Sequence, residues 1–423
     1  MTVFGVILPA AVGHFDPTAA LAHRLQERGH HPVFLMVRDW QQRVEAEGFG
    51  YHPVLEEECP AGTWAGILEK MSALDGQANL KYTLEYYERE AHALFRDVPA
   101  AVEAQGIEAL LVDQTVFAGS TVAEHLGLPF VTLCCALALN RELDIPPSSS
   151  PWGYQPNRWG RLRNRLGYTA LDWLTRKLRR TLQQQRTRWQ LPPLARWNGT
   201  YSPFAQISQQ PQAFDFPRQQ LPRHFHYTGP IRGPSHSRAP AFPFDRLNGR
   251  PLLYASLGTI QNRRLEIFKT IAAACAGLEV QLAIAHGGGL DDNTVAQLPG
   301  RPIAVAYAPQ LEVIRRSAAV ITHAGLNTTL DALAHGLPVV ALPLVHEQPA
   351  IARRILWTGT GAALWPSELN PTSLRSLISE VLEDPTYRQA AGRIKQAIDQ
   401  SGGVNRAADV CEQVFLTRKP VPA

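Results

Sequence analysis

The sequence has 423 residues, of which 45% are hydrophobic and 18% charged, and its formal net charge is +4. A chain of this length and composition can bury substantial cores and exceeds a typical single domain, so we expect two domains of roughly 200 residues each. The small net charge argues against a nucleic-acid-binding protein. Five cysteines without a Cys-x-x-Cys pair fit a reducing compartment better than a disulfide-bonded secreted protein.

The sequence opens with an apolar run, residues 3–8, and lacks the basic and then apolar layout of a signal peptide. No apolar run approaches the ~20 residues that cross a membrane. We therefore expect a cytoplasmic protein. Contact with a membrane surface is left open.

The N-terminal half holds a candidate pair of catalytic side chains. A loop after the first predicted strand (residues 3–8) carries Gly13 and His14, and a helix is expected from Thr18. Asp113 ends another buried strand, and the carboxyl ends of parallel strands meet at one edge of a sheet. His14 is therefore expected to act as a general base, with Asp113 holding its tautomer. A loop histidine alone is more often a surface or capping residue, so this assignment also depends on the C-terminal pattern below.

A basic, tryptophan-rich segment spans residues 152–197. Its helix-prone part, residues 158–188, holds ten Lys or Arg against one acid. One interpretation is a solvated basic helix that packs its aromatic side chains on the N-terminal domain. The other is a membrane-surface element, because basic residues suit anionic lipid headgroups and Trp suits the interface.

A proline-rich stretch without periodicity, residues 230–243, is the expected linker. It separates residues 1–229 from a second β/α domain, residues 244–400. The final segment, residues 401–423, is expected to be a helix.

The most informative stretch is residues 320–348. An apolar run that ends before Gly325 predicts a buried strand, and the following apolar positions recur at helical spacing. His323 then lies where the strand passes into the helix. Asn327 and Thr328 lie in the first helical turn, where unpaired backbone N–H groups favour an anion such as a phosphate.

Two further loops are expected at the same edge of the second sheet. One begins with Gly258-Thr259 after the first strand of the domain, where backbone N–H groups could approach a phosphate. The other carries Glu347-Gln348 and follows the strand after the helix. Open α/β sheets bind their ligands at this edge.

This block resembles the donor-binding signature of family 1 glycosyltransferases. Their usual Trp-x-Pro-Gln element corresponds to Tyr307-Ala308-Pro309-Gln310. The resemblance implies an α/β protein with the GT-B fold, in which two Rossmann-like β/α/β domains face a central cleft. It also implies that Tyr307 stacks on uracil and that Gln310 meets the base through its backbone.

The same resemblance implies roles for the other donor residues. His323 and the pair Asn327-Thr328 would hold the diphosphate, and Asp331 the ribose hydroxyls. Glu347-Gln348 would bind the sugar hydroxyls. No metal or other cofactor is implied beyond the UDP-sugar substrate, and the sequence has no Asp-x-Asp motif.

Three positions depart from the family pattern. Tyr307 replaces Trp and could loosen base selectivity, Ala324 replaces Gly or Cys, and Glu347 replaces Asp. The last substitution extends the carboxylate by one methylene and leaves the identity of the sugar open.

The resemblance spans nearly the whole chain. It implies that residues 1–229 bind the acceptor, that residues 244–400 bind the donor, and that the helix in 401–423 crosses back onto the N-terminal domain. Two segments, Ile-Thr-His-x-Gly-Leu-Asn-Thr and Ala-Arg-Arg-Ile-Leu-Trp, most resemble the corresponding segments of carotenoid glucosyltransferases. The implied reaction moves a sugar, glucose by this resemblance, from a UDP-sugar to a hydroxyl of a hydrophobic acceptor, a carotenoid such as zeaxanthin.

A base on one face of the sugar and departure of the diphosphate from the other imply inversion at the anomeric carbon. Other acceptors stay open, namely polyketide, sterol and flavonoid or phenolic alcohols. Two different classes also remain. A nucleotide-sugar epimerase of the same architecture would need no acceptor, and a non-catalytic UDP-sugar-binding subunit would need no base.

Overall fold

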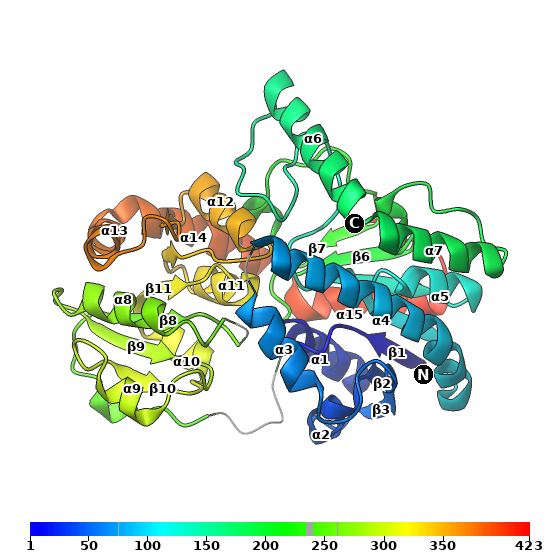
Figure 1. The fold of residues 1–423 in the computed structure, drawn as a ribbon, viewed down its shortest axis with the longest axis horizontal. Helices are drawn as coiled ribbons and strands as arrows, with labels where there is room; N and C mark the ends of the chain where they lie inside the picture. The colour runs from blue at the N-terminus through cyan, green and yellow to red at the C-terminus, as the bar shows by residue number, and fades with distance from the viewer. Residues whose placement is uncertain (75, 234–239, 260) are drawn as a thin grey trace.

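Two parallel β-sheets, each covered by helices, organise the chain (Figure 1). The structure is a computed structural model that describes residues 1–74, 76–233, 240–259 and 261–423. Each pairing between the described strands is parallel. Two sheets of this kind confirm the predicted α/β class with two Rossmann-like units.

The first sheet has seven strands in the order β3-β2-β1-β4-β5-β6-β7. Its central strands are apolar on both faces because helices cover both sides. The strands are β1 (Val3–Ile7), β2 (His31–Met36), β3 (Gly50–Pro53), β4 (Ala109–Asp113), β5 (Phe130–Cys134), β6 (Ala205–Ser208) and β7 (Phe225–Tyr227).

Seven α-helices of the described residues precede the predicted linker. Of these, α3 ends at Ala73 and α4 begins at Gly76, and residue 75 lies outside the described part. The helices are α1 (Val12–Glu27), α2 (Gln41–Ala46), α3 (Trp64–Ala73), α4 (Gly76–Gln105), α5 (Gly119–His125), α6 (Arg158–Leu174) and α7 (Arg176–Arg188).

The second sheet has six strands in the order β10-β9-β8-β11-β12-β13, the arrangement of a dinucleotide-binding fold. The strands are β8 (Leu252–Ser256), β9 (Gln281–Ala285), β10 (Ile303–Val305), β11 (Ser317–Thr322), β12 (Val339–Ala341) and β13 (Gly361–Ala363). The accompanying helices are α8 (Leu265–Cys275), α9 (Asp292–Ala296), α10 (Gln310–Arg315), α11 (Leu326–Ala334), α12 (Gln348–Thr358), α13 (Pro371–Glu383), α14 (Pro385–Gln400) and α15 (Gly403–Thr417).

The last helix, α15, belongs to the core of the first sheet. Its apolar side chains pack with those of β1 and α1, and Phe4 and Phe415 have their ring centroids 5.6 Å apart. Arg28, directly after α1, also forms an ion pair with Asp409 at 2.8 Å. The chain therefore passes from the second sheet back to the first at its C-terminal end.

The start of α1 corrects one prediction. The expected helix begins at Thr18, but the observed helix begins at Val12 and includes Pro17. Proline has no N–H for the carbonyl four residues earlier, so the carbonyl oxygen of Gly13 lacks its usual helical partner. It accepts a hydrogen bond from Asn327 Nδ2 at 2.8 Å instead. The proline that suggested a loop thus leaves an acceptor free for the other domain.

The structure describes only part of the predicted linker, because residues 234–239 lie outside the described residues. Among the described residues, no helix is long and apolar enough to cross a bilayer.

Candidate active site

The strand order brings His14 and Asp113 together. β1 and β4 are neighbours, with Ile7 opposite Val112, so the segments after both strands leave the same edge of the sheet. His14 lies in the first turn of α1, and Asp113 is the last residue of β4. The Nδ1 atom of His14 is 2.8 Å from Oδ2 of Asp113. The contact that the sequence predicted is present, although His14 belongs to a helix rather than to a loop.

The charges of this dyad stabilise each other. Burial disfavours the imidazolium, but the charge of Asp113 and the hydrogen bond to it outweigh burial, so the pKa of His14 is raised. Burial likewise opposes the carboxylate, yet the interactions with His14 and Thr115 lower the pKa of Asp113. The Nδ1 bond leaves the Nε2 atom of His14 available to accept a proton.

Thr115 holds the second oxygen of Asp113, a contact that the sequence analysis missed. Its backbone N–H and its hydroxyl donate to Oδ1 of Asp113 at 2.8 and 2.6 Å. An aspartate that binds the backbone two residues on is a common local motif, so the spacing Asp-x-Thr was a usable signal.

Asp113→Asn tests the electrostatic part of this dyad. A base must be deprotonated, and Asp113 raises the pKa of His14, so the acid limb of the pH-rate profile should move to lower pH in the variant. Turnover at the plateau should also fall, because the amide no longer stabilises the imidazolium. The pH dependence of kcat for both proteins measures this, and an unmoved acid limb would contradict the assignment.

A second buried carboxyl group lies near the dyad. Glu90 of α4 is 6% exposed, and its Oε1 atom is 3.3 Å from the hydroxyl of Tyr86. Burial raises the pKa of Glu90 to about 8, so the group is largely protonated at neutral pH. The sequence analysis did not identify Glu90 as a site residue.

Two glycines enclose His323 on the donor side. β8 and β11 are neighbouring strands, so the loop after β8 lies beside His323. A Cβ atom on Gly258 would lie 2.8 Å from Cε1 of His323, and one on Gly325 would lie 2.6 Å from it. A side chain at either position would therefore displace the ring of His323. Ala324, between His323 and Gly325, has a left-handed backbone with φ 63°.

The imidazole of His323 is uncharged at neutral pH. Burial lowers the pKa of His323 to about 4. The ring can therefore meet a diphosphate as a neutral N–H donor but not as a cation. Positive potential for the anion comes from the N-terminus of α11, which begins at Leu326.

Asn327 joins α11, the predicted donor helix, to the domain of the first sheet. Its Nδ2 atom donates to the Gly13 carbonyl, and its Oδ1 atom accepts from Gln209 Nε2 at 2.7 Å. Arg232 donates to the backbone carbonyl of Asn327 at 3.3 Å. Asn327, the predicted diphosphate ligand, thus contacts the residue that precedes His14, the predicted base, across the interface between the two domains.

The carboxylate of Asp331 is less accessible than its predicted role as a ligand of the ribose hydroxyls requires. Its side chain is buried, and its two oxygens accept from Arg232 Nε and Gln310 Nε2, each at 2.7 Å. A ribose hydroxyl would have to share or displace one of these partners. The sequence analysis missed Arg232, because an arginine in a proline-rich stretch looks like part of a spacer.

The other predicted donor residues are placed at the same edge of the second sheet. Tyr307 is 57% exposed, so its ring is free to stack on a base. The Oε1 atom of Gln348 accepts two backbone N–H groups at 2.9 Å each and so shapes its own loop. Glu347 precedes α12, and its charge contributes to the raised pKa of His14. Thr328 is buried in the first turn of α11, and Thr259 is exposed in the loop after β8.

Within the described residues, one group of three side chains could hold a metal ion. The ligand atoms of His14, Asp113 and Cys135 lie within 4.8 Å of one another. The hydrogen bond of the dyad already accounts for two of them. Cys135 is buried, and burial raises the pKa of its thiol well above the usual value, which disfavours the thiolate that a metal would bind.

Comparisons with known proteins agree with this architecture. Residues 273–403 match a family described as erythromycin biosynthesis protein CIII-like, C-terminal domain. A zeaxanthin glucosyltransferase of Pantoea ananas is 35% identical over 100% of this chain and 98% of its own length. One of Pseudescherichia vulneris is 34% identical over 100% of both chains.

Solved structures show the same fold at lower identity. A calicheamicin glycosyltransferase superposes with a TM-score of 0.76 at 23% identity over 99% of both chains. A Streptomyces glycosyltransferase complexed with thymidine diphosphate has a TM-score of 0.67 at 18% identity, over 98% of this chain and 100% of its own. These likenesses confirm the expected GT-B fold. The sequence relatives, which extend over the full length, place the chain in the family 1 glycosyltransferases.

Proposed function

We propose that this glycosyltransferase moves glucose from UDP-glucose to a hydroxyl of a carotenoid such as zeaxanthin. One observation carries the proposal: the dyad of His14 and Asp113 lies beside the donor helix, where Asn327 contacts Gly13 at 2.8 Å. The proteins from Pantoea ananas and Pseudescherichia vulneris support the choice of sugar and acceptor, because both are named for this activity.

In the proposed reaction, the acceptor oxygen attacks the anomeric carbon while His14 Nε2 takes the hydroxyl proton. The bond from that carbon to the diphosphate breaks on the opposite face, and UDP leaves with the bonding electron pair. The configuration inverts, so an α-linked donor yields a β-glycoside. His323 and the N-terminus of α11 would stabilise the charge that develops on the leaving diphosphate.

The proposal requires no metal or other cofactor, because neutral N–H donors and a helix N-terminus can meet the diphosphate. We place the reaction in the cytoplasm, with the enzyme peripheral to a membrane. The choice of uridine rests on Tyr307, which is exposed at the expected position. Glu347 and Gln348 are the proposed ligands of the sugar hydroxyls, and Asp331 is the proposed ligand of the ribose.

Incubation of the purified protein with UDP-glucose and detergent-solubilised zeaxanthin tests the proposal by product mass. We expect addition of hexose to zeaxanthin and slower transfer from thymidine diphosphate glucose. Parallel reactions contain phenolic, sterol and macrolide alcohols. Transfer only to one of these would replace the carotenoid, and conversion of UDP-glucose without any acceptor would indicate an epimerase.

A further inference from the structure

The outward face of α6 carries large apolar side chains. Trp159, Leu162, Leu166 and Trp173 are 78%, 48%, 62% and 63% exposed. Their spacing of three, four and seven residues puts them on one face of the helix. α6 projects from the body of the molecule at the top of Figure 1. A soluble helix normally turns such a stripe toward the core, and here the stripe faces away from it.

The inward face of α6 is built from small and polar residues. Gly160 and Asn164 are buried, and Asn164 Nδ2 donates to the Leu143 carbonyl at 2.9 Å. The hydroxyl of Tyr168 donates to the Ile145 carbonyl at 3.0 Å. These contacts orient the helix, so the outward stripe is a consequence of specific packing.

The following helix, α7, turns its apolar side chains toward the domain. Its apolar residues Leu178 and Leu182 belong to the core of the first sheet, and Arg186 forms an ion pair with Glu124 at 2.6 Å. The two interpretations of the basic segment therefore apply to different helices. α7 packs its apolar face on the domain, whereas α6 leaves its apolar face uncovered in this chain.

Basic side chains border the apolar stripe. Arg158, Arg165 and Lys177 are exposed, and no carboxylate of the described residues lies within ion-pair distance of them. Arg161 differs, because Asp144 binds it at 2.6 Å. An apolar stripe beside free positive charges complements a bilayer surface that contains anionic headgroups.

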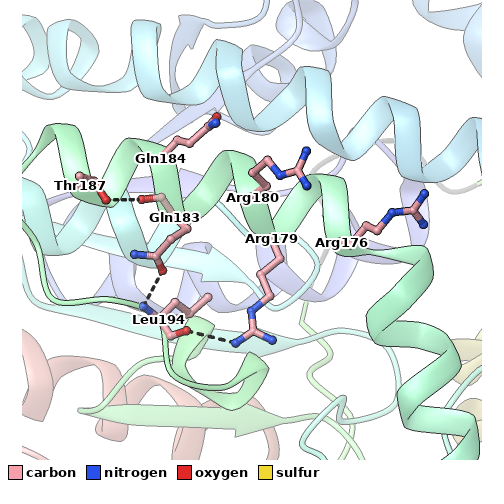
Figure 2. A pocket seen from close by; sticks show the side chains of 7 residues that line it. All are labelled: Arg176, Arg179, Arg180, Gln183, Gln184, Thr187 and Leu194. Carbon is pink, nitrogen blue, oxygen red and sulfur yellow. Dashed lines mark hydrogen bonds between the residues drawn. The ribbon is translucent and has the colours of Figure 1, made fainter.

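A basic hollow lies on α7, the helix that follows α6 (Figure 2). It is an open depression of about 400 Å³, and its lining includes Arg176, Arg179 and Arg180. Arg179 is turned toward Leu194 and donates to the carbonyls of Leu194 and Ala195. The guanidinium of Arg176 also lies 4.4 Å from the ring centroid of Trp173, the last residue of the stripe. Stripe and hollow are therefore adjacent, and the hollow can take the phosphate of a headgroup.

We propose that α6 and the hollow on α7 form a docking surface for an anionic lipid bilayer. Trp159, Leu162, Leu166 and Trp173 enter the headgroup region, and the exposed guanidinium groups of Arg176 and Arg180 bind lipid phosphates. The inference deepens the proposed function, because a carotenoid dissolves in lipid and an enzyme on the bilayer surface meets its acceptor there.

Flotation with vesicles tests the docking surface without any need for catalysis. We expect the protein to float with vesicles of phosphatidylcholine and phosphatidylglycerol at low salt, and to float far less with phosphatidylcholine alone or at high salt. The double variant Trp159→Gln/Leu166→Gln should lose flotation. Arg158→Gln/Arg165→Gln should weaken binding to the anionic vesicles by about fivefold per charge removed.

Leu416→Gln is the matched control, because Leu416 is 73% exposed on α15, outside the surface. It should float like the parent protein. Equal flotation of the Trp159→Gln/Leu166→Gln variant, or no flotation of the parent protein, would overturn the proposal. Light scattering could instead show that the parent protein is a dimer, that the double variant is a monomer, and that neither binds lipid. This result would assign the stripe to a contact with a second copy of the chain and would also overturn the proposal.

A second readout separates this inference from the proposed function. The variant Trp159→Gln/Leu166→Gln should glycosylate zeaxanthin in detergent at the parent rate and lose transfer to zeaxanthin in vesicles. Transfer in detergent without flotation of the parent protein would leave the proposed function intact and reject docking. Flotation without transfer to zeaxanthin would keep docking and reject the acceptor.

Discussion

Replacing His14 by alanine is expected to lower turnover at least about a hundredfold, the lower end for loss of a general base. The side chain is 22% exposed, and its Nδ1 atom is held 2.8 Å from Asp113, so Nε2 can reach an acceptor hydroxyl. Alanine leaves no group that can take the proton at this position. Steady-state kinetics with an unactivated alcohol measure the loss.

The identity of the acceptor sharpens this test. An acidic phenol ionises without help, so the loss in His14→Ala should shrink strongly with such an acceptor. The KM for UDP-glucose should change little, because His14 is not among the predicted donor ligands. His31→Ala, at an exposed histidine that begins β2, is the control and should keep parent activity. Near-normal turnover of His14→Ala with an unactivated alcohol would remove it as the base.

Asp215→Ala is expected to cost about 3–5 kcal/mol of stability, as when one partner of a buried ion pair is removed. Asp215 is 5% exposed and lies between two buried guanidinium groups. Its carboxylate is 2.7 Å from Arg218 and 2.7 Å from Arg354 of α12. In the variant, both guanidinium groups stay buried but lose the negative charge of Asp215.

This ion pair also joins the two halves of the molecule. Arg354 belongs to the helix after β12, whereas Asp215 lies in the connection between β6 and β7 of the first sheet, just after the short helix at residues 212–214. Urea unfolding of Asp215→Ala should therefore show an earlier midpoint, and two separate transitions are a natural result. Glu27→Gln removes an exposed partner of Arg24 and should change stability only slightly. Equal effects of the two substitutions would contradict the buried-pair argument.

The stability difference should depend on pH in one direction. Burial opposes the charge of Asp215, but Arg218 and Arg354 outweigh it and hold the pKa of that carboxyl far below its usual range. A depressed pKa contributes stability above the unfolded-state value of ~3.9, and this contribution is lost as pH falls toward the native value. The gap between parent and Asp215→Ala should therefore persist near neutrality and narrow in acid.

Much of the fold and part of the site could be predicted because the signals are local. Buried parallel strands are continuous apolar runs, and helices show their period within a few turns. The segments after such strands share one edge, which predicted that His14 and Asp113 face one crevice, and the observed pairing of β1 with β4 brings them into contact. His323 and Gly325 were likewise readable, because the transition from strand to helix lies within a few residues.

Other features depended on contacts between segments far apart in the chain. Pro17 suggested a loop, yet α1 includes it, because the unpaired Gly13 carbonyl finds Asn327 of the other domain. Arg232 looked like part of a spacer and is instead bound to Asp331. No local pattern encodes such pairings, since each partner has ordinary neighbours in its own segment.

The orientation of α6 shows the same limit most clearly. The sequence predicts a basic helix that contains tryptophan, and it leaves open whether the apolar side chains face the domain or a membrane surface. Only the packing of Asn164 and Tyr168 on the carbonyls of Leu143 and Ile145 determines which face is turned inward. Periodicity describes the faces of a helix, whereas the tertiary contacts select the one that remains exposed.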